Sequence, residues 1–152
     1  MTTTTRLEEQ PFEPAAELAE LTRSATGAGA VVSFVGIARS ISGAGEEVER
    51  LVLEHHPRLT SESLQEIASD TASRFEVSQV RVVHRSGEIA PGEPIVFAGA
   101  AAPHRRAAFE AADYLMDRLK TEAVFWKREE GATGASWIEP TEDDYADRRR
   151  WE

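Results

Sequence analysis

Two lysines are the residues of this chain whose chemistry is hardest to replace. Lys120 and Lys127 are its only lysines, whereas the other fifteen of its seventeen basic residues are arginine. An arginine guanidinium stays protonated in proteins, but a lysine amine can lose its proton when burial or a nearby cation lowers its pKa. The lysines stand seven residues apart, in a segment that also contains Phe125 and Trp126. They are candidates for acid/base or nucleophilic work, against the alternative of a plain compositional bias toward arginine.

A second candidate site lies where a predicted strand gives way to a predicted helix, at Pro103-His104-Arg105-Arg106. A helix N-terminus presents unpaired N–H groups and the positive end of the helix dipole, and an arginine adds a bidentate fork, so phosphate or carboxylate can bind there. Taken alone, these residues could equally cap the helix or pair with surface acids. Arg39, just after another predicted strand, could meet a ligand or face solvent.

The net charge of the chain restricts the class of its partners. A formal charge of −10 argues against non-specific nucleic-acid binding and against attachment to an anionic membrane, since both need a cationic surface. Residues 104–128 nevertheless carry six Lys/Arg against four Asp/Glu, a local charge of +2. Positive charge is therefore concentrated around the lysines, where a small anion can bind.

Several other chemistries lack the residues they need. The chain has no cysteine, which excludes a thiolate zinc site, a disulfide framework and a cysteine nucleophile, so any sulfur must come from another molecule. His55 and His56 point to opposite faces of a predicted strand, and His84 is expected to be structural; we predict no metal and no cofactor. No phosphate-binding loop or G-x-S-x-G elbow is present. No apolar stretch resembles a signal peptide, so we expect a cytoplasmic protein.

The elements that must position these residues follow from periodicity and from turn residues. We expect a polar and mostly loose segment over 1–13, a single domain over 14–140, and a charged tail or short helix over 141–152. Within the domain the pattern predicts helices over 14–26, 60–75 (capped by Thr60) and 104–119, and strands over 29–38 (with a bulge or a close backbone approach at Gly36), 48–55, 80–85, 94–101, 124–129 and 137–139. The first two strands are expected to form an antiparallel pair. The predicted class is α+β.

The ordered set of motifs resembles the MoaE family, the large catalytic subunit of molybdopterin synthase, over roughly residues 10–140. The resemblance is carried by Gly29-Ala-Val-Val-Ser-Phe-Val-Gly36 followed by Arg39, Leu53-Glu54-His55, His84-Arg85-Ser86-Gly87-Glu88, Pro91-Gly92-Glu93, His104-Arg105, Leu119-Lys120-Thr121 and Phe125-Trp126-Lys127-Arg128-Glu129. It implies an α/β hammerhead fold with mixed and antiparallel strands and two to three packed helices. It also implies a homodimer that binds one small ubiquitin-like sulfur carrier of the MoaD type at each end, making a heterotetramer.

The implied activity is that of a sulfurtransferase in molybdenum cofactor biosynthesis. Cyclic pyranopterin monophosphate would gain two sulfurs from carrier C-terminal thiocarboxylates and become the dithiolene of molybdopterin. Carried over by position, the resemblance makes Lys120 the lysine beside the thiocarboxylate and Lys127 the second catalytic lysine, with Arg39, His104 and Arg105 lining the substrate pocket. Which lysine transfers a proton stays open.

The chain departs from the family pattern at a few positions. Ser40 and His56 replace an acidic and an aromatic residue, and Thr141 stands where an arginine that acts across the dimer is expected. Arg148, Arg149 or Arg150 could replace that arginine. Two other functions stay open at this point: a non-catalytic module that docks an acidic partner tail, and a different lysine enzyme such as a Schiff-base lyase. A docking module would tolerate arginine at both lysine positions.

Overall fold

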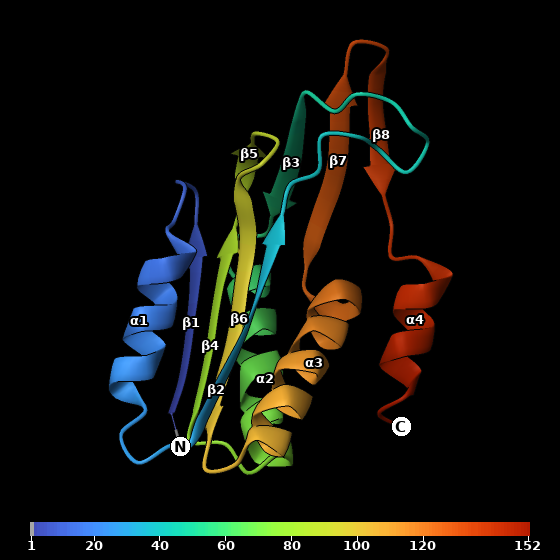
Figure 1. Ribbon diagram of the computed structural model, residues 1–152. Helices are drawn as coiled ribbons and strands as arrows, with labels where there is room; N and C mark the ends of the chain where they lie inside the picture. The colour runs from blue at the N-terminus through green and yellow to red at the C-terminus, as the bar shows by residue number, and fades with distance from the viewer. Residues whose placement is uncertain (1) are drawn as a thin grey trace.

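The computed structural model describes residues 2–152 and arranges them as two four-stranded sheets and four helices (Figure 1). The predicted α+β class is confirmed. One sheet is the long body of the molecule and the other stands above its end, with β5 following directly on β4 (Figure 1). None of the helices within residues 2–152 is both long and apolar enough to cross a lipid bilayer.

The body sheet has the strand order β1-β4-β6-β2, formed by Thr2–Glu8, Gln79–Arg85, Pro94–Ala102 and Ala30–Ile37. β1 runs parallel to β4, and the other neighbours are antiparallel. The register shifts between Gly36 and Ile37, but the residue left unpaired there is Ile95 of β6, so Gly36 itself does not form the bulge. Gly36 instead lies at a close approach, since a Cβ there would be 2.9 Å from the Val96 side chain. The predicted pairing of β2 with the strand over 48–55 is wrong, because β2 pairs with β6. β6 is apolar on both faces and therefore suits an inner position of the sheet.

Both faces of the body sheet are covered by helices. α1 (Pro14–Ser24) packs on one face, and α2 (Leu59–Arg74) and α3 (Arg105–Glu122) pack on the other (Figure 1). Successive side chains of β6 point to opposite faces and so contact different helices. Val96, Ala98 and Ala100 contribute to the core under α2 and α3, and Phe97 and Ala101 contribute to the core under α1. Gly99 lets α1 approach closely, because a Cβ there would lie 2.7 Å from the side chain of Leu21.

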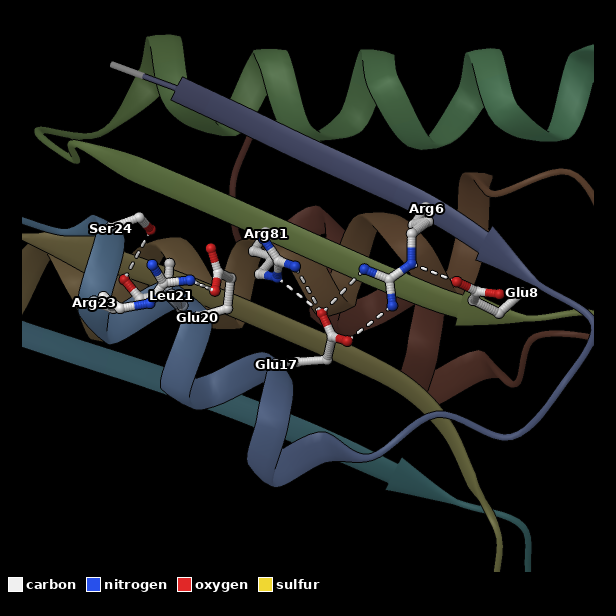
Figure 2. Close-up of polar contacts among 8 residues, drawn as sticks. All are labelled: Arg6, Glu8, Glu17, Glu20, Leu21, Arg23, Ser24 and Arg81. Carbon is white, nitrogen blue, oxygen red and sulfur yellow. Dashed lines mark hydrogen bonds and ion pairs between the residues drawn. The ribbon is translucent and has the colours of Figure 1, made fainter.

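The N-terminal segment differs from the expectation of a loose region. Residues Thr2–Glu8 form β1, and a buried carboxylate from α1 reaches across to it. Figure 2 shows Glu17 between Arg6 of β1 and Arg81 of β4, with contacts of 2.8 Å to each. A threonine-rich sequence without apolar alternation does not predict this strand, which pairs along its whole length with β4 and gains an ion pair to α1.

The second sheet has the order β5-β3-β7-β8, formed by Gly87–Ile89, Arg50–His55, Phe125–Gly131 and Gly134–Ile138, all antiparallel. The short β5 was not predicted, since three residues carry too little periodicity. Thr60 does not cap α2 as predicted. It lies inside the helix, where its hydroxyl donates to the carbonyl of Val124, while the His56 ring accepts hydrogen bonds from the first N–H groups, those of Arg58 and Leu59.

The C-terminal segment forms the short helix that was one of two expectations, α4 (Glu142–Arg149), which lies beside α3 (Figure 1). Trp151 fixes its end: the indole packs edge-on against Phe75 and Tyr114, and its Nε1 donates to Asp117 at 2.7 Å. Ion pairs from Arg148 and Arg150 to acids of α3 add to this contact. α4 is thus held by polar and aromatic contacts and buries no residue of its own.

Candidate active site

Both lysines line one cavity of about 470 Å³. Lys120 comes from the last turn of α3 and Lys127 from the middle of β7, so a single short connection brings them to the same space. Aromatic residues, Phe125, Trp126 and Trp137, are part of its lining. Thr141, Asp144 and Tyr145, from the start of α4, also line it. The cavity therefore lies where α3, the second sheet and α4 meet.

Lys127 is the titratable group that the cavity perturbs most clearly. Its side chain is half-buried, and burial together with the positive charge of Lys120 lowers its pKa from 10.5 to about 8, while the carboxylate of Asp144 acts in the opposite direction. A group with this pKa exists in part as the free amine near neutral pH. Lys120 itself is exposed at the same cavity. The site thus combines an amine able to exchange a proton with a second, exposed cation.

Arg39 also lines the cavity, and a buried acid determines its orientation. Nε and Nη2 of Arg39 donate to the two carboxylate oxygens of Glu129 at 2.8 and 2.9 Å. Glu129 is 9% exposed, whereas half of the Arg39 side chain reaches solvent. This bidentate pair raises the pKa of Arg39 and leaves Nη1 available for a ligand. Glu129 was not predicted as a site residue, although its position two residues after Lys127, on the same face of β7, was a signal.

His104 and Arg105 lie at the other end of α3. His104 occupies the N-cap position without a side-chain capping hydrogen bond, Arg105 is the first helical residue, and both are exposed. Arg105 and Lys120 are fifteen positions apart along α3, so their Cα atoms are separated by roughly 22 Å at 1.5 Å per residue. Within one protomer the structure therefore brings Lys120, Lys127 and Arg39 together, and it places His104 and Arg105 away from them.

Thr141, one of the positions that depart from the family pattern, has a local structural role, and so do two of the arginines that could replace the expected one. Thr141 caps α4 by accepting a hydrogen bond from the Asp144 N–H, and Asp144 accepts one from the Thr141 N–H in return. Arg148 pairs with Glu122, and Arg150 with Asp113 and Asp117. In this protomer, Arg148 and Arg150 thus hold α4 against α3. Asp144, missed by sequence analysis, enters the cavity because this helix packs there.

Comparison with known proteins agrees with this geometry. The model of the MoaE protein family matches residues 7–122. The chain belongs to the MoaE family. The molybdopterin synthase catalytic subunit of Caulobacter vibrioides is 48% identical over 146 residues, which cover 96% of this chain and 95% of that protein.

Solved structures of MoaE proteins share the fold. The molybdopterin biosynthesis MoaE protein from Burkholderia ambifaria is 36% identical, with a TM-score of 0.81 over 99% of this chain and 98% of that chain. A complex of subunits 1 and 2 of molybdopterin-converting factor from Helicobacter pylori has a TM-score of 0.73 at 17% identity, over 91% of this chain and 90% of that chain. The MoaE fold expected from the sequence is therefore confirmed.

Proposed function

We propose that this MoaE chain is the catalytic subunit of a molybdopterin synthase and acts as a sulfurtransferase. It would transfer sulfur from the C-terminal thiocarboxylate of a small ubiquitin-like carrier to cyclic pyranopterin monophosphate, forming the dithiolene of molybdopterin in the cytoplasm. The observation that carries the proposal is that both lysines of the chain and Arg39 line one cavity in a MoaE fold. The name of the Caulobacter vibrioides relative supports the same activity. The absence of cysteine is consistent with sulfur supplied by a carrier.

The positions of the lysines support different roles. Lys120 is exposed at the cavity, where its charge can meet the anionic thiocarboxylate of an incoming carrier tail. Lys127 is half-buried with a pKa of about 8, so it can give up and regain a proton as the thioacyl adduct forms and breaks. Arg39, oriented by Glu129, would bind the phosphate or the pterin.

Single-turnover sulfur transfer tests these roles. With a thiocarboxylated carrier and cyclic pyranopterin monophosphate, Lys127→Arg should lose most product, because a guanidinium keeps its proton near neutral pH. Lys120→Arg keeps the charge and should retain more activity, while carrier binding persists in both. Near-normal turnover by Lys127→Arg would show that this position needs only positive charge. No dithiolene product from the wild type would reject the function itself.

We further propose that the chain works as a homodimer with one carrier on each protomer. β2 is an edge strand of the body sheet, and it exposes Phe34 (44%) and Ile37 (59%), which supports an apolar contact there. Since His104 and Arg105 lie outside the cavity of their own protomer, they can bind substrate only if a second copy places them at its partner's cavity.

A complementation experiment tests this shared site. Lys127→Ala and Arg105→Ala homodimers are each expected to be weakly active. If Arg105 acts across the dimer, a mixed dimer contains one site with both residues intact, so mixing and re-equilibrating the two variants should restore activity. If mixing restores nothing although mixed dimers form, Arg105 does not act in the partner's site. A monomer by light scattering at micromolar concentration would reject the dimer.

A further inference from the structure

His84 lies at the junction of the two sheets and has no role in the function proposed above. It is the last residue but one of β4 and is 4% exposed. Its ring stacks on Phe125, the first residue of β7, with centroids 4.2 Å apart and planes inclined by 24°. Phe125 in turn lines the cavity that contains the lysines. His84 therefore packs directly on a residue of the cavity lining.

The imidazole of His84 is held neutral in a single tautomer. Its Nδ1 lies 2.8 Å from the carbonyl oxygen of Arg85, and because a carbonyl can only accept, Nδ1 carries the proton. Burial, together with the positive charge of Lys127, lowers the pKa of His84 to about 3, although the Arg85 carbonyl acts in the opposite direction. The ring therefore adds no charge to the site, and it is too weak a base to take a proton from Lys127.

Lys127 follows Phe125 by two residues on β7, so both side chains leave the strand on the same face. The stack of His84 on Phe125 thus lies on the face of β7 from which Lys127 extends. The other ionisable groups that line the cavity are Arg39, Lys120, Glu129, Glu139, Asp144 and Tyr145. This neutral aromatic pair adds no further charge to that face of β7.

We propose that His84 is a positioning residue for Lys127: its neutral ring backs Phe125, excludes water from the amine and so keeps the uncharged amine accessible near neutral pH. Its importance for catalysis rests on the proposed function, but its effect on Lys127 does not. The proposal predicts that the shape and neutrality of the ring matter, and that the basicity of the imidazole does not.

The presence of only two lysines makes a direct test possible. NMR of protein labelled at the lysine side chains gives one ammonium/amine titration for each lysine, and Lys120→Arg assigns the pair. His84→Asn can still donate to the Arg85 carbonyl but removes the ring, and it should raise the Lys127 midpoint by roughly one pH unit as water enters. His84→Phe keeps a neutral ring and should leave the midpoint close to the wild-type value.

Two further variants keep the test decisive. Ile67→Val removes a buried methyl from α2, away from the cavity, and should lower stability without moving the Lys127 midpoint. Phe125→Leu removes the stacked ring from the other side and should raise the midpoint even if His84→Asn does not fold. An unchanged midpoint in the folded variants, or an equal shift in His84→Phe and His84→Asn, would overturn the proposal. The titration needs no turnover, so it remains valid if sulfur transfer fails.

Discussion

Burial and the neighbouring charge of Lys120 together hold the pKa of Lys127 at about 8, well below its ordinary value of 10.5. The folded protein therefore disfavours the ammonium form. The resulting decrease in the free energy of unfolding is fully present below about pH 8. Between these two pKa values the unfolded chain binds more protons than the folded one, so the contribution of Lys127 to stability improves as pH rises.

We expect this linkage to be visible in unfolding experiments. The free energy of unfolding of the wild type, relative to Lys127→Met, should rise by at most about 3 kcal/mol between pH 8 and 10.5. The methionine variant removes the titrating amine and keeps the length of the side chain, so other titrations cancel in the comparison. Urea unfolding at a series of pH values measures it. Parallel profiles for the two proteins would mean that Lys127 titrates normally.

Glu129 should control the binding of substrate through Arg39. Glu129→Gln offers only one oxygen to the guanidinium, so Arg39 should lose its fixed orientation, and the apparent KM for the pyranopterin should rise roughly tenfold, the equivalent of one charged hydrogen bond. Glu130→Gln is the matched control, because that acid pairs with Arg50 and Arg128 and does not line the lysine cavity. If the KM of Glu129→Gln is no higher than that of Glu130→Gln, Glu129 does not act in substrate binding.

Trp151 should determine whether α4 stays in place. Trp151→Ala removes the indole from Phe75 and Tyr114 and its hydrogen bond to Asp117, which leaves α4 with exposed ion pairs of small individual value. Hydrogen exchange over residues 142–149 should become at least about tenfold faster, while the body sheet stays protected. Ile41→Ala, an exposed apolar residue outside the cavity that α4 lines, is the control. Unchanged exchange in α4 would show that the other contacts are sufficient.

The buried Glu17 should make folding sensitive to acid. Burial raises its pKa, but hydrogen bonds from Arg6 and Arg81 outweigh this and hold the pKa below 4.5, so the stabilisation is present above that pH and is lost as the pH falls below it. Glu17→Gln should destabilise the protein by about 3 kcal/mol at neutral pH, because two arginines lose their charged partner. Glu20→Gln, exposed on the same helix, should have little effect. Thermal unfolding between acid and neutral pH distinguishes the two.

Much of the architecture could be predicted from the chain alone, because apolar periodicity reports which face of an element is buried. The continuous apolar run in β6 predicted a buried strand, and the expected helix over 104–119 corresponds to α3 near its observed bounds. The rarity of lysine indicated Lys120 and Lys127, and the order of motifs indicated the MoaE family. These inferences hold because they depend on local geometry and residue type.

Only the tertiary structure decided which elements meet. Any apolar strand could have paired with β2, so its pairing with β6 and the strand in Thr2–Glu8 were not readable from periodicity. Arg39 and Glu129 are 90 residues apart, and nothing local predicts their pairing. The pKa of Lys127 depends on burial and on the place of Lys120, and the length of α3 separates Arg105 from both lysines. Sequence determined the chemical groups, and packing determined their distances, because charge and burial act through space.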